Sequence, residues 1–230
     1  MPSVLVTGSN RGLGLEWCRQ YAEAEWRVFA SCRDPGTADA LNDLARAHRR
    51  LSVHRLDVTR PESVCALRAE LQNESIDVLV NNAGVYFEKC ASTATMRYDE
   101  WLHTLEVNTL GPLRVTEALV DLVARSRRRL VVAITSHMGS IAEISAPGDT
   151  YYRSSKAALN AAMKGLSFAV LERGIGVLLL HPGWVKTRMG GWDAPLTTAE
   201  SVAGMRTLVD AFSLDQSGRF LRYDGTDIPW

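Results

Sequence analysis

Short runs of apolar, often β-branched residues alternate with longer amphipathic stretches along nearly the whole chain. Most of the short runs are continuously apolar rather than alternating, which is typical of strands buried on both faces of a parallel sheet. The pattern predicts strands over residues 3–7, 26–32, 51–56, 76–80, 129–135, 174–180 and 218–222. It predicts helices between them, over about residues 12–24, 37–47, 61–73, 98–125, 150–172 and 198–213.

This alternation predicts an α/β fold: a doubly wound, Rossmann-type domain with a mostly parallel seven-stranded sheet and helices on both faces. We expect one domain over residues 1–230, because this length suits a single large core. Ligands of such sheets bind beyond the carboxyl ends of the strands, so chemically active residues are expected there. Residues 184–196 carry no predicted element and contain Trp184, Gly190-Gly191 and Trp192. We interpret them as a mobile flap over the site, with an ordinary surface loop as the alternative.

Composition and charge exclude several classes of protein. Apolar residues make up 46% and charged residues 23% of the chain, and the formal net charge is zero. This balance suggests neither a nucleic-acid nor a membrane-surface partner. No apolar run is long enough for a membrane span and no signal peptide is apparent, so a cytoplasmic protein is expected. The cysteines at positions 18, 32, 65 and 90 lack metal-binding spacing, so we expect reduced thiols and no metal site.

A glycine-rich segment, Thr7-Gly8-Ser9-Asn10-Arg11-Gly12-Leu13-Gly14, joins the first predicted strand to the first predicted helix. Glycines allow a sharp turn and a close approach of the backbone to a ligand. The free N–H groups and the dipole of the following helix favour a pyrophosphate. The T-G-x-x-x-G-x-G spacing departs from the G-x-G-x-x-G fingerprint, but its place between strand and helix still predicts a dinucleotide site.

Two further motifs supply polar groups for catalysis. Tyr152 and Lys156 are four residues apart, so they share one face of a predicted helix. A cation beside a phenol favours the phenolate, so Lys156 is expected to lower the pKa of Tyr152 from about 10 and make it a usable proton donor. Ser136 directly follows a predicted strand, where its hydroxyl could bind a substrate oxygen. Taken singly, the pair could be a solvated helix face and the serine an ordinary turn residue.

Together these motifs resemble the short-chain dehydrogenase/reductase family, and the resemblance covers nearly the whole chain. Asn81-Asn82-Ala83-Gly84 is similar to the family's N-N-A-G motif, and Asn108 stands where the family has its helix asparagine. Residues 182–187, Pro-Gly-Trp-Val-Lys-Thr, are similar to its P-G-x-V-x-T segment. The C-terminal residues 218–230 further resemble the branch that contains C-signal proteins and sniffer-like carbonyl reductases.

The resemblance implies a role for each matching residue. Tyr152 would be the general acid in carbonyl reduction, and Lys156 would lower its pKa and bind the nicotinamide ribose. Ser136 would orient the carbonyl oxygen, and Asn108 would hold a water of the proton relay. Ser140 is nearer the customary spacing from the tyrosine, but Ser136 is preferred because it ends the strand directly. The implied cofactor-binding residues are Gly8, Ser9, Asn10, Arg11, Gly12, Leu13, Gly14, Arg33, Asp57, Val58, Asn82, Ala83, Gly84, Tyr152, Lys156, Pro182, Gly183, Val185 and Thr187.

The end of the second strand bears on the choice of nicotinamide. An acidic residue there would bind the 2′-hydroxyl of NAD, whereas an arginine accommodates the 2′-phosphate of NADP. By resemblance, Cys32 stands where NAD-preferring members place an aspartate, and Arg33 follows it, with Arg11 in the glycine loop. Asp34 lies about 20 residues past the glycines, as an NAD fingerprint expects, but we interpret it as one residue too late. The expected cofactor is therefore NADP(H).

The sequence thus predicts an NADPH-dependent oxidoreductase that reduces a ketone or aldehyde to an alcohol, with that small molecule as its partner. The alternative is a nucleotide-binding signalling or regulatory protein of the C-signal type, without relevant turnover, which fold alone does not exclude. A nucleotide-sugar epimerase is disfavoured, because its large C-terminal substrate region is missing. The resemblance also allows a homo-oligomer, either a dimer or a tetramer, and leaves the substrate and the physiological direction open.

Overall fold

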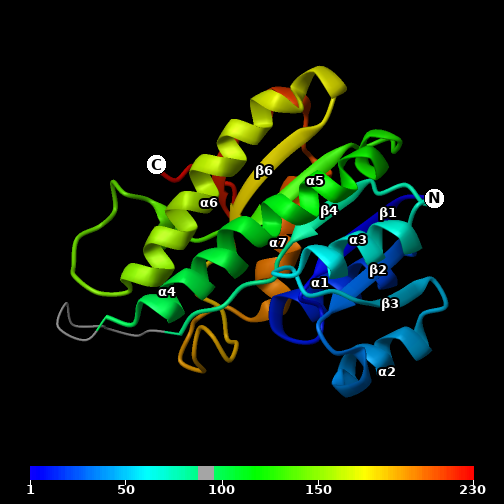
Figure 1. Cartoon of the computed structure of the whole chain (residues 1–230), viewed down its shortest axis with the longest axis horizontal. Coiled ribbons are helices and arrows are strands. Elements are labelled where there is room, and N and C mark those ends of the chain that lie inside the picture. Colours follow the sequence, from blue (N-terminus) through cyan, green and yellow to red (C-terminus); the bar gives the residue numbers. More distant parts are fainter. Residues whose placement is uncertain (88–95) are drawn as a thin grey trace.

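The computed structural model describes residues 1–87 and 96–230, so Cys90 lies outside the described residues. A seven-stranded sheet forms its centre, in the order β3-β2-β1-β4-β5-β6-β7, and all neighbouring strands are parallel (Figure 1). The strands are β1 (Ser3–Thr7), β2 (Arg27–Cys32), β3 (Leu51–Arg55), β4 (Val78–Asn81), β5 (Leu130–Ile134), β6 (Gly176–His181) and β7 (Arg219–Arg222). The predicted doubly wound α/β fold is confirmed, and each strand begins and ends within two residues of its expected bounds.

Helices cover both faces of the sheet. They are α1 (Gly12–Glu23), α2 (Asp39–Ala47), α3 (Pro61–Glu70), α4 (Tyr98–Leu105), α5 (Gly111–Ala124), α6 (Thr150–Ala169) and α7 (Thr198–Asp210), with short turns η1 (Pro35–Thr37), η3 (His137–Gly139), η4 (Leu171–Arg173) and η5 (Leu214–Gln216). Helix starts have local causes: Pro61 occupies the first turn of α3, and Thr197 and Glu200 form a capping box before α7. No helix in the described part of the chain is both long enough and apolar enough to cross a membrane.

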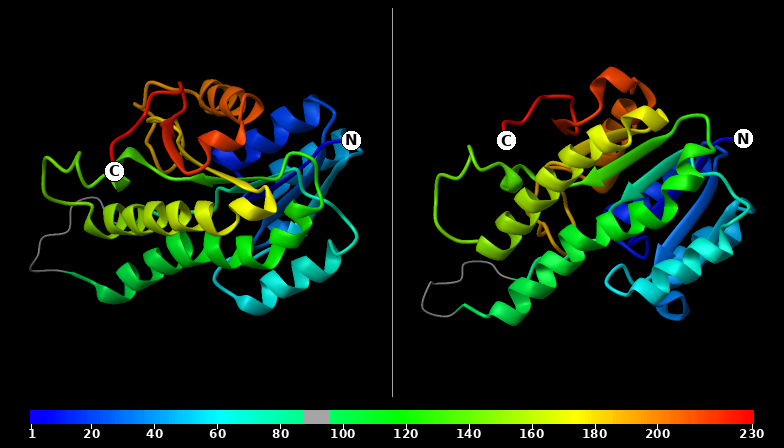
Figure 2. Two further views of the ribbon diagram at one scale, coloured as in Figure 1. Left: turned by 90° about the horizontal axis from the view of Figure 1, so that it is seen from above. Right: turned by 45° about the horizontal axis from the view of Figure 1, so that its top comes forward.

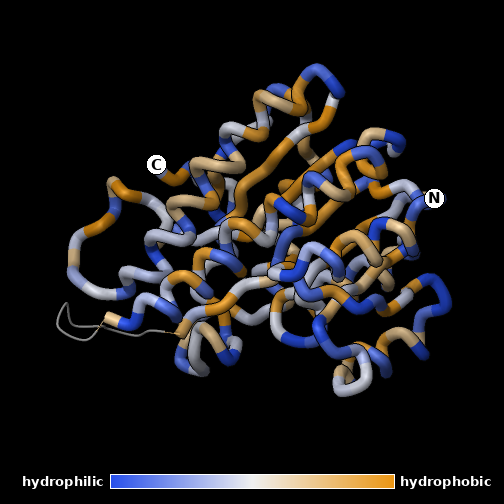
Figure 3. The backbone as a smooth tube through the Cα atoms, in the orientation of Figure 1, coloured by the Kyte–Doolittle hydropathy of each residue, from blue (hydrophilic) through white to orange (hydrophobic). Residues whose placement is uncertain are grey.

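Two hydrophobic cores explain why the strands are continuously apolar. Successive side chains of a strand point to opposite faces, so Val4 and Val6 of β1 join one core and Leu5 joins the other. The first core contains buried residues of α1, α2 and α7, and the second contains those of α3, α5 and α6. Figure 2 shows these helices on opposite sides of the sheet, and Figure 3 shows how hydrophobic the strands between them are.

The order of the strands reverses at β1, which lies between β2 and β4. Such a reversal opens a crevice beyond the carboxyl ends of the two central strands, where doubly wound folds bind ligands. The glycine loop follows β1 and Asn82 follows β4, so both border this crevice. At the opposite end of these strands, the Ser3 N–H and hydroxyl both donate to the Asp77 carboxylate, at 2.9 and 3.1 Å.

The helix predicted over about residues 98–125 is present as a continuous helical stretch, but it is not regular. A π-helical turn, η2 (Glu106–Leu110), separates α4 from α5, and the Gly111 N–H donates to the Glu106 carbonyl. Pro112 has no N–H, so the regular bond from residue 112 to the Asn108 carbonyl cannot form. Single π turns inside helices occur frequently at functional sites, and Asn108 lies at the centre of this one.

Candidate active site

The glycine loop, residues 8–14, packs directly against the segment after β4. Gly8 has a φ of +68°, and a Cβ on it would lie 2.9 Å from the Ala83 Cα. A Cβ on Gly14 would lie 2.2 Å from the Gly8 carbonyl oxygen. Because no side chain fits at either position, both glycines are required for the chain to turn here and enter α1.

The N-terminus of α1 fits a dinucleotide. Its N-cap residue, Arg11, makes no side-chain cap hydrogen bond. First-turn N–H groups and the positive end of the helix dipole are therefore available to a pyrophosphate. Thr187 reaches the same place, because a Cβ on Gly12 would lie 3.6 Å from the Thr187 Cγ2. The structure thus brings the predicted glycine loop and the end of segment 182–187 to one surface.

Asn82 holds the glycine loop in position. Its side-chain N–H groups donate to the carbonyls of Thr7 at 2.8 Å and Gly8 at 3.2 Å. The backbone N–H groups of Asn82 and Ala83 both donate to the Thr7 hydroxyl, each at 3.0 Å. The Asn82 amide N–H groups are therefore used inside the protein, and we assign Asn82 a positioning role beside the cofactor surface.

Ser9 also points inward, although it was predicted to bind the cofactor. Its hydroxyl donates to the Val6 carbonyl at 2.8 Å, and its backbone N–H donates to the Ser31 carbonyl at 2.8 Å. Ser9 is fully buried. Its donors are therefore occupied in joining the loop to β1 and β2.

The structure at the end of β2 distinguishes Arg33 from Asp34, the two candidates for contacting the adenosine ribose. Cys32 is buried, whereas Arg33 is exposed. The Asp34 carboxylate accepts the Gly36 N–H at 3.1 Å and the Thr37 hydroxyl at 3.2 Å. Asp34 thus stabilises the turn η1, and its carboxylate is already hydrogen-bonded there.

Asp57 and Val58 follow β3, next to the end of β2. Burial alone would raise the pKa of Asp57, but hydrogen bonds from Thr59 and the charges of Arg33 and Arg60 lower it overall. One Asp57 oxygen accepts both the Thr59 N–H, at 3.0 Å, and its hydroxyl, at 2.7 Å. Arg33 and Asp57 therefore lie within electrostatic reach of each other, on the side where the sequence predicted the adenosine.

Ser136, Tyr152 and Lys156 meet at the carboxyl end of β5. The Ser136 hydroxyl accepts the Met138 N–H at 3.1 Å and is hydrogen-bonded to the Tyr152 side chain. Tyr152 and Lys156 are one turn apart on α6, and the Lys156 Nζ lies 5.7 Å from the centre of the Tyr152 ring. The same Nζ donates to the Ile134 carbonyl at 2.9 Å. Residues from two separate predicted motifs are thus brought together.

The ionisation of the tyrosine and the lysine differs from the expectation. Burial raises the pKa of Tyr152 to about 12, and the hydrogen bond with Ser136 offsets this only in part. Burial lowers the pKa of Lys156 to about 8. The expectation that the pKa of Tyr152 is lowered was therefore wrong here, because the loss of water around the phenol is the largest influence on its ionisation. At neutral pH the phenol is protonated and most of the lysine is charged.

Ser140, the alternative serine, is used within its own loop. It is fully buried beyond η3, and its hydroxyl accepts the Glu143 N–H at 3.3 Å. Ser136, by contrast, is hydrogen-bonded to Tyr152. The geometry therefore favours Ser136 over Ser140 as the serine beside the reacting oxygen.

The Asn108 side chain is saturated by contacts within the protein. Its Oδ1 accepts the Val85 N–H at 2.8 Å, and its Nδ2 donates to the Val85 carbonyl at 2.9 Å and the Ser155 hydroxyl at 3.0 Å. A Cβ on Gly84 would lie 3.3 Å from Oδ1. Asn108 therefore fixes the backbone after β4, and its role of holding a water of the proton relay stays a prediction.

Residues 182–196 fold back on themselves. Gly183 has a φ of +82°, and the Lys186 N–H donates to the Leu196 carbonyl at 2.8 Å. The Trp184 indole N–H donates to the Gly190 carbonyl at 2.7 Å, closing the tip. Trp184 and Trp192 nevertheless remain 55% and 77% exposed. The predicted flap is thus a hydrogen-bonded loop that presents two aromatic side chains to solvent.

We expect limited proteolysis to cut within residues 184–196 in the free protein, and the cutting to slow when NADPH and a substrate are both present. The exposed tip makes few contacts, so it can open locally without unfolding the sheet. Mass spectrometry of the fragments would map the sites. An equal cleavage rate with saturating ligands would contradict closure of this loop over a substrate.

Two aromatic contacts near the phenol were missed by the sequence analysis. His137 Nδ1 lies 3.2 Å from His181 Nε2, and burial lowers the pKa of both imidazoles. The neighbouring ends of β5 and β6 bring them together, so strand order could have revealed this pair. The Tyr86 ring packs against the Tyr152 ring in a tilted arrangement, with ring centres 4.6 Å apart, and no spacing in the sequence indicates that contact.

Comparison with known proteins agrees with this geometry. A family model described as "short chain dehydrogenase" matches residues 2–194. The C-signal of Myxococcus xanthus is 44% identical over 155 residues, which cover 67% of this chain and 93% of that protein. The carbonyl reductase Sniffer of D. melanogaster has a TM-score of 0.93 and 34% identity, with both chains fully covered. An NADPH-bound carbonyl reductase from chicken fatty liver has a TM-score of 0.92 and 35% identity, covering 100% of this chain and 99% of that one. The chain therefore belongs to the short-chain dehydrogenase family of oxidoreductases.

Proposed function

We propose that this protein is an NADPH-dependent carbonyl reductase that converts a ketone or aldehyde into an alcohol. The observation that carries the proposal is the Ser136–Tyr152 hydrogen bond beside the buried Lys156 ammonium, at the edge of the dinucleotide surface. When bound, the nicotinamide supplies the hydride. A protein that only binds a nucleotide has no evident need for a phenol next to a buried ammonium.

In this proposal Ser136, Tyr152 and Lys156 each have a separate role in reducing the carbonyl. As the substrate oxygen gains negative charge, Tyr152 donates its proton to that oxygen. The positive charge of Lys156 stabilises the phenolate that is left, and this attraction is strong because Lys156 is almost completely buried. The Ser136 hydroxyl orients the oxygen, while Asn108 holds the backbone after β4 that borders the site. Proton transfer and charge stabilisation thus both come from α6 and the end of β5.

Arg33 supports a preference for NADPH over NADH. It is exposed at the end of β2, where Cys32 offers no carboxylate and that of Asp34 is engaged in its own turn. A guanidinium pairs well with a phosphate and has no comparable partner in a ribose hydroxyl. The chicken-liver relative was solved with NADPH. NADP(H) is therefore our proposed cofactor.

Isothermal titration is expected to show NADPH binding more tightly than NADH, and Arg33→Ala should shrink this gap about 10–100-fold, the usual value of one charge-assisted pair. Arg173→Ala is the matched control, because Arg173 is an exposed arginine of η4 that pairs with Asp121. It should leave the gap unchanged. Equal affinities for the two nucleotides in the unmodified protein would contradict the assignment.

The similarity to C-signal supports a second candidate function, a nucleotide-binding signalling protein without relevant turnover. Measuring NADPH oxidation with a panel of ketones and aldehydes distinguishes the reductase from the signalling candidate. Turnover of any member that depends on Tyr152 supports the reductase. Tight NADPH binding without turnover across the panel would favour the signalling candidate. A cytoplasmic location and a dimer or tetramer remain predictions.

A further inference from the structure

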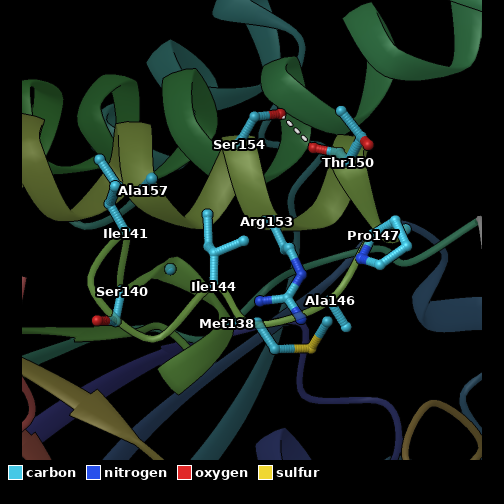
Figure 4. A pocket seen from close by; sticks show the side chains of 12 residues that line it. Met138, Ser140, Ile141, Ile144, Ala146, Pro147, Thr150, Arg153, Ser154 and Ala157 are labelled. Atoms are coloured by element: carbon cyan, nitrogen blue, oxygen red, sulfur yellow. Dashed lines mark hydrogen bonds between the residues drawn. The ribbon is translucent and has the colours of Figure 1, made fainter. Parts of the chain in front are cut away.

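A groove of about 420 Å³ lies between α6 and the segment that follows η3 (Figure 4). Its volume falls in the range of small-molecule sites, roughly 300–1,000 Å³. Met138, Ile141, Ile144 and Pro147 supply apolar wall, and none of its 12 lining residues is acidic. The groove therefore suits a ligand with a hydrocarbon part.

One charged side chain, that of Arg153, reaches into this apolar groove. Figure 4 shows it extending from α6 between Ile144 and Ala146 toward Met138. Its Nε is buried and has no hydrogen-bond partner among residues 1–87 and 96–230. Asp149, four residues earlier, instead accepts a hydrogen bond from the Tyr86 hydroxyl. Leaving a buried donor unpaired is unfavourable, so a ligand that brings a hydrogen-bond acceptor to the Arg153 Nε would be stabilised there.

The groove is distinct from the proposed catalytic centre. Successive residues of a helix are rotated by about 100°, so Arg153 and Ala157 lie on a different face of α6 from Tyr152 and Lys156. Neither Tyr152 nor Ser136 lines the groove. A molecule can therefore contact Arg153 without contacting the phenol.

We propose that this groove binds a small amphipathic carboxylate. The carboxylate pairs with the Arg153 guanidinium, whose planar fork matches two oxygens, and the hydrocarbon chain packs on Ile141 and Ile144. A single cation among the lining residues fits a monoanion better than a phosphate dianion. Both the charge and the apolar wall are needed, so neither a neutral alcohol of the same length nor a short carboxylate should bind comparably.

The test uses octanoate as the probe and 1-octanol as its neutral counterpart, titrated into the whole protein by calorimetry. We expect octanoate to bind the unmodified protein and to bind Arg153→Gln at least about tenfold more weakly. Octanol should bind weakly and equally to both. Acetate, which lacks the chain, should also bind weakly. Circular dichroism and thermal unfolding verify that Arg153→Gln is folded.

Three further variants locate the site. Ala157→Phe should fill the groove and abolish octanoate binding, whereas Arg173→Gln, an exposed arginine outside the groove, should leave it unchanged. Tyr152→Phe should also leave it unchanged. The proposal is overturned if octanoate does not bind, if Arg153→Gln binds it equally well, or if octanol binds as tightly. Loss of binding in Tyr152→Phe would place octanoate in the catalytic centre and would likewise overturn it.

Discussion

Tyr152→Phe is expected to lower kcat for carbonyl reduction by about 10²–10⁴-fold, the usual value of a positioned acid. The substitution removes one hydroxyl, and with it the hydrogen bond to Ser136, while the ring can keep its contact with the Tyr86 ring. NADPH affinity should change little, because we propose that the pyrophosphate contacts the glycine loop and α1 rather than the phenol. Steady-state kinetics and calorimetry measure the two effects separately.

The neighbouring tyrosine offers a matched control. Tyr151 is buried, and its hydroxyl accepts the Arg97 N–H at 2.6 Å, away from Ser136. Tyr151→Phe therefore loses a phenol and a hydrogen bond, and we expect it to lose stability but to keep kcat within a few-fold. Near-normal turnover by Tyr152→Phe on an established substrate would refute the proton-transfer role and favour the signalling candidate.

Lys156→Met is expected to abolish most activity and, at neutral pH, to stabilise the fold. Lys156 is only 5% exposed, and burial lowers its pKa from 10.5 to about 8. At about 1.4 kcal/mol for each pKa unit, holding the ammonium there costs on the order of 3 kcal/mol. The lost hydrogen bond to Ile134 offsets about 1 kcal/mol of this. A net gain of about 2 kcal/mol corresponds to a rise in Tm of about 4–8 °C in a chain of this size.

The stability gained in Lys156→Met is expected to depend on pH. Between pH 8 and 10.5 the unfolded lysine holds a proton that the folded lysine has released, so the unmodified protein gains stability as pH rises through this window. The difference in the free energy of unfolding between the unmodified protein and Lys156→Met should therefore shrink between about pH 8 and pH 10.5. Lys164→Met is the control, because the half-buried Lys164 also donates to a carbonyl, that of Gly218. A difference that does not change with pH, or a destabilised Lys156→Met, would contradict the buried-charge explanation.

Carbonyl reduction should also weaken as pH rises through about 8, because the Lys156 ammonium is lost there while Tyr152, with a pKa of about 12, keeps its proton. The sequence alone would have attributed such a decline to the tyrosine. Measuring kcat against pH in Tyr152 and Lys156 variants distinguishes the two groups, since any residual rate of Lys156→Met should not fall as pH rises through about 8.

The fold could be predicted from the sequence because a sheet with a core on each face requires continuously apolar strands and amphipathic helices, and both patterns are visible along the chain. The sequence placed Ser136 in one motif and Tyr152 with Lys156 in another, and the fold brings the end of β5 and the face of α6 together. Burial was not predictable in the same way. The raised pKa of Tyr152 and the inward-turned donors of Ser9 and Asn82 depend on neighbours from other elements, which spacing along the chain does not show.

The π turn at Asn108 and the groove at Arg153 were also missed, for different reasons. The Gly111-Pro112 pair marks the interruption of the helix, so the missing N–H of Pro112 was a usable signal. Arg153 looked like an ordinary helix residue within the tyrosine–lysine motif. Its surroundings come from residues 138–148, and no local pattern shows that this segment leaves the Arg153 Nε without a partner among the described residues.

The central place of β1 has a consequence for biosynthesis. Strand β1 is synthesised before the other strands of this sheet and pairs with β2 on one edge, but its other edge stays unpaired until β4 is made. Ser3 likewise waits for Asp77, 74 residues later, before its N–H and hydroxyl find their acceptor. A nascent chain that ends before β4 therefore exposes an apolar, unpaired strand edge, the feature that favours aggregation. Chaperone binding during synthesis should accordingly be strongest before β4 emerges.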